Sequence, residues 1–210
     1  MMAMTEAAGF ALAVVMVWCS IRELHWSWPL AIASSVMYFF VFRDSQLYGE
    51  ASLQIVFALL AVWGWRQWLK QPTQPSLALV HDDTQASLIA DANDQNHHNG
   101  ASTGITRLSL RGRWLTLAAS LLLWPVLALF LKHYTDTDVP WWDGGVTALS
   151  LVGQYLLGRK VLENWGLWMV ANTLSMGLFA YKALWLTVLL YAIFAVMSGV
   201  GWRTWQRQIH

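Results

Sequence analysis

Long apolar runs separated by short polar segments make up most of this chain. Seven of the runs are long enough to cross a bilayer as helices, and they do not show the period-two alternation of barrel strands. A backbone in lipid must satisfy its own hydrogen bonds, so we predict that all seven form α-helices. The predicted spans are residues 6–21, 28–42, 48–65, 114–131, 144–158, 164–180 and 184–201.

One polar segment, between the third and fourth spans, is much longer than the other connections. It is rich in Gln, Asn, Asp, Ser and Thr and contains two prolines. Such a composition buries too little apolar surface to fold alone, so we interpret the segment as a linker. The predicted units are a first triple-helix bundle at 1–70, the polar linker at 71–113, a linker transmembrane helix at 114–135 and a second triple-helix bundle at 136–210.

Composition places the chain in the membrane. It has 210 residues, of which 57% are hydrophobic and only 12% are charged, a balance typical of an integral membrane protein. The single cysteine, Cys19, excludes an internal disulfide. The amino terminus lacks the basic region of a cleaved signal, so we expect the first span to be retained. The basic residues form no patch that could bind nucleic acid.

The basic residues predict sidedness instead. Seven spans place the two termini on opposite sides, and Lys and Arg are enriched on the cytoplasmic side of membrane proteins. We therefore predict that the amino terminus is outside and that the carboxyl terminus and the linker are cytoplasmic. The cytoplasmic group is Arg22, Arg66, Lys70, Arg107, Arg111, Arg113, Arg159, Lys160, Arg203 and Arg207, against Arg43, Lys132 and Lys182 outside.

The chain also contains an internal repeat. An offset of 137 aligns residues 6–68 with residues 143–205 without a gap, and 15 of the 63 pairs are identical. The agreement is clearest at the ends, where GWRQW matches GWRTW, and it includes Trp28 with Trp165 and Arg22 with Arg159. Shared apolar composition does not produce matched Trp, Arg and Gly at constant spacing.

The repeat predicts a specific membrane architecture. Each half holds three helices, and the single span between them restores the direction of the second half, so the two repeats run parallel. We predict an all-α integral membrane fold with seven transmembrane helices in a three-plus-one-plus-three arrangement. In such proteins the substrate site lies near the membrane midplane, between the halves. A purely structural duplication remains the alternative.

The sixth span carries polar and aromatic residues on one face. Trp165, Trp168, Asn172 and Ser175 are spaced by three, four and three residues, which places them on the same side of a helix. Asn172 lies near the bilayer centre, where an amide must face protein, water or a ligand. Interhelical hydrogen bonding is the structural alternative. Its repeat partner is Ser35, so we expect an asymmetric pocket.

Other polar side chains at depth favour a cavity over isolated helix contacts. Gln54 and Gln154 lie well inside the third and fifth spans, and Tyr38, Ser34 and Ser35 lie in the second. Most tryptophans fall at span ends, as expected for interfacial belts, but Trp168 lies one turn from Asn172 and could stack on a planar ligand. Trp63 is a weaker candidate of the same kind.

The sequence lacks the patterns of an enzyme. We find no phosphate-binding loop, no metal-ligand spacing within the spans and no nucleophile with a base, so we expect no catalytic residues, no metal and no cofactor. His97 and His98 lie in the linker, where a solvated pair is expected. A chain of buried acids, as proton-driven pumps need, is also missing, which favours passive movement.

Three stretches resemble the Pnu family of bacterial vitamin transporters. They are LYGEASLQIVFALLAVWGWRQW, PWWDGGVTALSLVGQYLLGRKVLENWGLWMVANTLS and LLYAIFAVMSGVGWRTW, and together they cover nearly all of both halves. The resemblance implies a fold like that of SWEET sugar carriers, an inner-membrane location, a homotrimer and facilitated diffusion of a vitamin that an intracellular kinase then traps. It also implies that Trp168, Asn172 and Gln54 contact the ligand.

The resemblance leaves the vitamin open among three candidates. Thiamine and nicotinamide riboside are both flat, cationic aromatic molecules that suit a Trp face, whereas riboflavin is neutral and larger. The short amino terminus and the TDTDVPWWD loop favour thiamine by a narrow margin, with nicotinamide riboside second and riboflavin third. A receptor or scaffold without transport is the competing class. The predicted ligand contacts are Trp168, Asn172, Gln54, Gln154, Trp165, Ser175, Tyr38 and Trp63.

Overall fold

The computed structural model describes residues 2–44, 48–70 and 104–209, so most of the predicted linker at 71–113 lies outside them. The described part is helical and contains a single isolated β-bridge but no strand. Seven helices are seen, near the seven predicted spans. They are α1 (Met2–Ile21), α2 (Ser27–Asp44), α3 (Tyr48–Lys70), α5 (Leu110–Tyr134), α6 (Pro140–Gly158), α7 (Asn164–Tyr181) and α8 (Trp185–Gln208).

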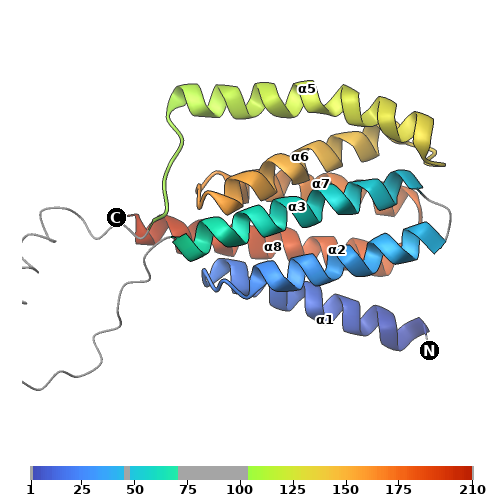
Figure 1. Ribbon diagram of the computed structural model, residues 1–210, viewed down its shortest axis with the longest axis horizontal. Helices are drawn as coiled ribbons and strands as arrows, with labels where there is room; N and C mark the ends of the chain where they lie inside the picture. Colours follow the sequence, from blue (N-terminus) through green and yellow to red (C-terminus); the bar gives the residue numbers. More distant parts are fainter. Residues whose placement is uncertain (1, 45–47, 71–103, 210) are drawn as a thin grey trace, which may run out of the picture.

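The helices lie side by side, and the amino and carboxyl termini are at opposite ends of the bundle (Figure 1). Six of them form a ring of neighbours in the order α1, α2, α3, α6, α7, α8, which closes where α8 packs on α1. The seventh, α5, lies outside this ring and packs on α6 and α3. The two halves therefore meet at two places, α3 against α6 and α8 against α1.

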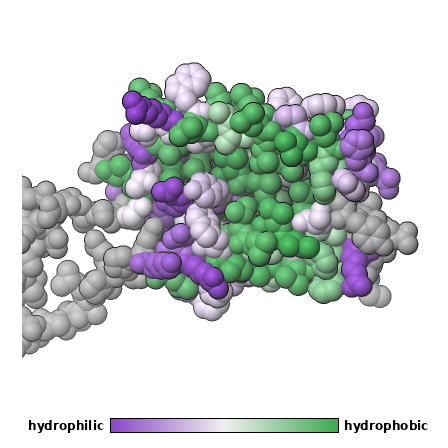
Figure 2. All heavy atoms as spheres, turned by 45° about the horizontal axis from the view of Figure 1, so that its top comes forward, coloured by the Kyte–Doolittle hydropathy of each residue, from purple (hydrophilic) through white to green (hydrophobic). Residues whose placement is uncertain are grey.

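An apolar band covers the middle of the bundle on the face seen in Figure 2. Figure 2 shows hydrophobic surface over the centre and hydrophilic residues at both ends. Within the described residues, α5 and α8 are long and apolar enough to cross a membrane by length and composition alone. The apolar stretches found in α1 and α2 are shorter, at Leu12–Ile21 and Ser27–Phe40. Seven membrane crossings therefore stay a prediction.

Helix α5 begins at Leu110, before the predicted span at 114, because a polar residue caps it. The Ser109 hydroxyl accepts a hydrogen bond from the Gly112 amide at 3.2 Å, which satisfies one of the free donors of the first turn. The preceding segment is fastened to the turn between α6 and α7. Ile105 is buried in the core, and Thr106 forms the β-bridge with Val161.

Glu163 completes this attachment. One carboxylate oxygen accepts from the Leu108 amide at 3.0 Å, and the other forms an ion pair with Arg113 at 3.1 Å. The Arg113 side chain is 55% exposed, so water weakens the pair, while the amide bond is better shielded. The start of α5 is thus held against the second half.

The repeat is visible in the backbone of two turns. Glu23 after α1 and Lys160 after α6 are repeat partners, and both adopt the left-handed conformation, with φ of 55° and 51°. Each turn makes the same two backbone hydrogen bonds. In the first half the Glu23 amide donates to the Ser20 carbonyl and the Leu24 amide donates to the Cys19 carbonyl. In the second half the amides of Lys160 and Val161 donate to the carbonyls of Leu157 and Leu156. This pattern is a Schellman cap, which ends a helix by satisfying its last carbonyls.

The two capping residues also contact each other. Lys160 Nζ lies 2.8 Å from a carboxylate oxygen of Glu23, and both side chains are mostly buried. Since repeat partners meet here, the approximate twofold axis relating the halves passes between them. The ammonium group of Lys160 also lies 5.2 Å from the ring centre of Trp68.

Four tryptophans fill the same end of the bundle. Trp28 packs edge-on against Trp68 with ring centres 5.4 Å apart, and Trp165 packs against Trp205 in the same way at 5.4 Å. All four are almost completely buried. Such edge-to-face pairs stabilise beyond the area that they bury. We refer to Trp28, Trp68, Trp165 and Trp205 as the tryptophan cluster.

Each half donates one indole N–H to the other half. Trp68 of α3 donates to the carbonyl of Leu157 at 3.1 Å, and Trp205 of α8 donates to the carbonyl of Ile21 at 3.2 Å. The acceptors lie at the carboxyl ends of α6 and α1, where helix carbonyls lack partners within the helix. The exchange joins the halves reciprocally.

Glycines in α3 and α8 make room for the rings of this cluster. A Cβ added at Gly201 would lie 2.6 Å from the Trp165 ring, and one at Gly64 would lie 2.3 Å from the Trp28 ring. Gly199, in the same helix as Gly201, has no atom within 4 Å of such a Cβ.

We predict that Gly201→Ala destabilises the protein by about 1–3 kcal/mol, because the Trp165 ring must move out of its packed position. Gly199→Ala is the matched control and should be neutral or stabilising by up to about 1 kcal/mol, since alanine is the better helix former. Thermal unfolding of the detergent-solubilised protein measures both. Equal unfolding temperatures for the two variants would show that the close glycine contact has no energetic role.

Candidate functional site

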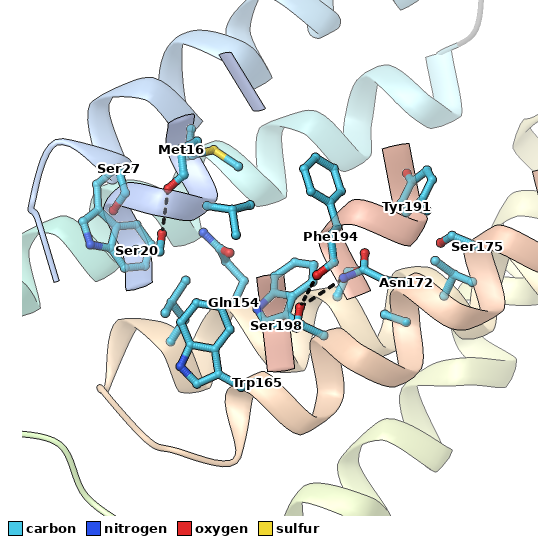
Figure 3. A pocket seen from close by; sticks show the side chains of 18 residues that line it. Met16, Ser20, Ser27, Gln154, Trp165, Asn172, Ser175, Tyr191, Phe194 and Ser198 are labelled. Atoms are coloured by element: carbon cyan, nitrogen blue, oxygen red, sulfur yellow. Dashed lines mark hydrogen bonds between the residues drawn. The ribbon is translucent and has the colours of Figure 1, made fainter. Parts of the chain in front are cut away.

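A cavity of about 220 Å³ lies inside the ring of helices, lined by 18 residues of α1, α2, α6, α7 and α8 (Figure 3). Its lining on α7 extends from Trp165 to Ser175, ten residues along the helix, or about 15 Å. The cavity is therefore elongated along the helix axes.

The tryptophan cluster closes one end of the cavity. Trp28 and Trp165, which are repeat partners, both line it and are only 1% and 2% exposed. Trp68 and Trp205 pack behind them, and Lys160 and Glu23 pair at the same end. At this end the two halves are in direct contact through the indole hydrogen bonds and the ion pair.

The polar groups of the cavity come mainly from α7 and α8. Asn172 Nδ2 donates to the Ser198 hydroxyl oxygen at 3.3 Å, and the Ser198 hydroxyl donates to the Phe194 carbonyl at 2.8 Å. Asn172 and Ser198 are 5% and 2% exposed. Tyr191 and Ser175 lie beside each other farther along the cavity (Figure 3).

Several lining groups have no hydrogen-bond partner among the described residues. They include three buried atoms, Ser27 Oγ, Trp28 Nε1 and Trp165 Nε1. The Gln154 side chain also makes no hydrogen bond within the described part of the chain, and Figure 3 shows its amide directed between α1 and α7. Buried polar groups require partners, so water or a ligand must supply them here.

The described lining residues carry no charge. Aromatic side chains, Trp28, Trp165, Trp168, Tyr191 and Phe194, provide π faces, and serine hydroxyls and two amides provide hydrogen bonds. A cationic ring can bind an aromatic face, whereas an anionic group would lose its hydration without a compensating cation. The cavity thus suits an uncharged or cationic aromatic molecule with hydroxyl or amide groups.

Five of the eight ligand contacts predicted from the sequence line the cavity. They are Trp165, Trp168, Asn172, Ser175 and Gln154. Gln54, Tyr38 and Trp63 are not among its lining residues. Trp63 instead stacks on Tyr155 with ring centres 5.0 Å apart.

Helix α3, which carries Gln54 and Trp63, supplies none of the described residues that line the cavity. Leu53, Phe57 and Leu60 of α3 pack with residues of α5 and α6 in a separate hydrophobic cluster. This contact turns that side of α3 away from the cavity. The corresponding part of α8 has no such neighbour among the described helices, and it supplies Tyr191, Phe194 and Ser198.

The α8 lining residues Tyr191, Phe194 and Ser198 were not predicted from the sequence, although the internal repeat contained one indication of them. The offset of 137 pairs Tyr191 with Gln54, so the predicted ligand contact on α3 has its counterpart on α8. Ser198 pairs with Ala61, and that comparison gave no signal. Ser35, the partner of Asn172, is buried outside the lining, so the cavity is asymmetric.

The chain is similar to known membrane transporters. The profile of the family described as "Nicotinamide mononucleotide transporter" matches residues 3–207. The nicotinamide riboside transporter PnuC of Escherichia coli (strain K12) is 26% identical over 172 residues, covering 79% of this chain and 69% of that protein. The riboflavin/roseoflavin transporter RibM of Streptomyces davaonensis is 22% identical over 202 residues, covering 96% of this chain and 84% of that protein.

A solved structure shows the same fold. The crystal structure of the vitamin B3 transporter PnuC superimposes with a TM-score of 0.68 at 22% sequence identity, covering 95% of this chain and 79% of that chain.

Proposed function

The chain belongs to the nicotinamide mononucleotide transporter family, a family of membrane transporters, and on that premise we propose that it imports nicotinamide riboside by facilitated diffusion. The Escherichia coli relative carries the riboside in its name. The preference for thiamine drawn from the sequence is not supported by these relatives, so nicotinamide riboside takes its place. The riboflavin transporter is the more distant relative.

The observation that carries this proposal is an aromatic cavity with two amides and no charge among its described lining residues. The pyridinium ring of the riboside is cationic and would stack on Trp168 or Trp165, a contact of about 0.5–2 kcal/mol. Its carboxamide would bond with Asn172 or Gln154, and its ribose hydroxyls with the serines. Each part of the molecule thus finds a chemical partner.

The same cavity argues against the phosphorylated form that the family description names. A mononucleotide carries a phosphate, which proteins bind with Lys, Arg or a helix amino terminus. Lys, Arg and His are all missing from the described lining residues. Burying a phosphate there would leave its charge unpaired, so we favour the riboside.

The small volume of the cavity makes riboflavin a less suitable substrate than nicotinamide riboside. Ligand pockets commonly enclose about 300–1,000 Å³, and this cavity of about 220 Å³ is smaller. The tricyclic ring of riboflavin is larger than a single pyridinium and carries no positive charge to stack on the tryptophans. The likeness to RibM still makes riboflavin the alternative to test.

The closed end of the cavity is where we place a gate. For the substrate to leave through this end, Trp28 and Trp165 must separate, and the ion pair between Glu23 and Lys160 must break. In transporters built from parallel repeats, such opening follows from rocking of one half against the other. The uncharged lining offers no proton relay, which supports passive movement.

We propose that this end faces the cytoplasm, with the amino terminus outside and the carboxyl terminus inside. The turns holding Arg22 and Lys160, and the end of α8 holding Arg203, lie at the end where the chain finishes (Figure 1). The proposal has four further parts. They are seven membrane crossings, the three-plus-one-plus-three plan with its four units, a homotrimer, and trapping of the substrate by an intracellular kinase. The first two are supported by the ring of contacts, and the last two by the resemblance alone.

Calorimetric titration of the purified protein tests the substrate. We expect micromolar binding of nicotinamide riboside and no measurable binding of nicotinamide mononucleotide, because the cavity has no cation to pair with phosphate. Thiamine and riboflavin complete the panel. Binding of thiamine or riboflavin in place of the riboside would assign a different vitamin, and binding of none would contradict a vitamin transporter.

Paired substitutions test which residues contact the substrate. Trp168→Ala should weaken riboside binding about 3- to 30-fold through loss of the cation–π contact, whereas Trp63→Ala should leave it unchanged. Gln154→Ala should likewise weaken binding more than Gln54→Ala, because only Gln154 lines the cavity. Isothermal titration with the four folded variants measures this. A larger effect from Trp63 or Gln54 would place the ligand elsewhere.

Reversible cross-linking tests the gate. With Cys19 replaced by serine, Glu23→Cys and Lys160→Cys can be bridged by a short thiol-specific reagent. We expect riboside uptake into proteoliposomes to stop when the bridge forms and to return after reduction. The single Glu23→Cys variant treated with the same reagent is the control. Undiminished uptake by fully bridged protein would show that this end need not open.

A further inference from the structure

We propose that Ser198 fixes the direction of the Asn172 amide and thereby makes the cavity select a hydrogen-bond donor on its ligand. The ligand class that meets this requirement is a pyridinium riboside bearing a carboxamide, as opposed to one bearing a carboxylate. This inference rests on the proposed function and assigns a specificity-determining role to a residue that the sequence did not single out.

The direction follows from the single proton of the Ser198 hydroxyl. The Phe194 carbonyl can only accept a hydrogen bond, so at 2.8 Å the hydroxyl proton must point toward it. The hydroxyl oxygen is then left as an acceptor. The Asn172 group 3.3 Å away must therefore present its NH₂ to Ser198, as Figure 3 shows.

The other side of the planar amide is then the carbonyl oxygen. Figure 3 shows the Asn172 oxygen on the side away from Ser198. It accepts no hydrogen bond from another described residue. If the amide turned over, its oxygen would face the Ser198 oxygen, and the hydroxyl would have to leave Phe194. Because both side chains are nearly fully buried, bulk water does not compensate for that loss.

The first half of the chain lacks this arrangement. The repeat pairs Asn172 with Ser35 and Ser198 with Ala61, and Ala61 is buried at the same depth of its helix. Only one side of the cavity therefore has an oriented amide, so an asymmetric ligand has one preferred direction. Ala61 of α3 also shows that the repeat accommodates an alanine at the position that Ser198 occupies in α8.

An oriented carbonyl distinguishes between two closely similar ligands. The carboxamide of nicotinamide riboside has an NH₂ group that can donate to the Asn172 oxygen. The carboxylate of nicotinic acid riboside has no donor, and its negative oxygens would face another oxygen. The difference lies in a single functional group, so the comparison isolates the Asn172 contact.

The experiment compares binding of nicotinamide riboside and nicotinic acid riboside to the unsubstituted protein and two variants. We expect the wild-type protein to prefer the amide. Ser198→Ala frees the Asn172 amide to turn over, so the ratio of the two dissociation constants should fall about tenfold. Ser20→Ala is the matched control, because Ser20 also lines the cavity and donates to the carbonyl four residues earlier, at 3.1 Å, and its ratio should stay constant.

A double variant separates this role from a structural one. Once Asn172→Ala has removed the amide, adding Ser198→Ala should not change the ratio further, although it could still change stability. An unchanged ratio in Ser198→Ala, with riboside binding intact, would overturn the inference and leave the proposed transport function standing. Failure of the wild-type protein to bind the riboside would instead overturn the proposed function itself.

Discussion

The two indole hydrogen bonds exchanged between the halves are the constraint on which this structure depends. Helices α1 and α6 both end inside a packed, largely apolar region, where the carbonyls of Ile21 and Leu157 have no solvent. A buried carbonyl without a partner costs about 1–3 kcal/mol. Trp205 removes that cost for Ile21, whereas the Leu157 carbonyl also accepts from the Lys160 amide at 3.0 Å. Separating the halves at this end would leave both buried indole N–H groups without an acceptor. The closed end of the cavity, which the tryptophan cluster forms, follows from this requirement.

The cavity is asymmetric because one helix has no counterpart. Helix α5 packs on α3 and α6 but nothing in the described chain covers α8 and α1 in the same way. The apolar side of α3 is therefore engaged by α5 and α6, while α8 directs Tyr191 and Ser198 into the cavity. The presence of α5 beside only one half thus makes the contributions of α3 and α8 to the cavity different, although the two helices are repeat partners.

The sequence predicted the helices and the part of the cavity that α7 lines, for reasons that the structure makes clear. Apolar runs had to be helices because lipid offers the backbone no other partner. The spacing of Trp165, Trp168, Asn172 and Ser175 was informative because neighbours on one helical face stay neighbours in the fold. 

Long-range packing was not accessible in this way. Self-comparison treats the matching helices α3 and α8 alike, so it does not show which of them faces the cavity. Tyr191 of α8 lines the cavity, whereas its repeat partner Gln54, predicted from its depth in the third span and from the family resemblance, does not. Ser198 was missed for a different reason. A serine bonded to the carbonyl four residues earlier has no distinctive sequence pattern, and its importance comes only from the side chain of another helix. The ion pair between the left-handed turns at Glu23 and Lys160 likewise becomes visible only when both halves are placed together.

This ion pair has a consequence for ancestry. A symmetric dimer of one three-helix unit would bring two identical side chains together at its axis, where like charges repel. Opposite charges can meet there only after both copies are joined in one gene and free to diverge, so this ion pair favours the single chain over any dimer of identical halves.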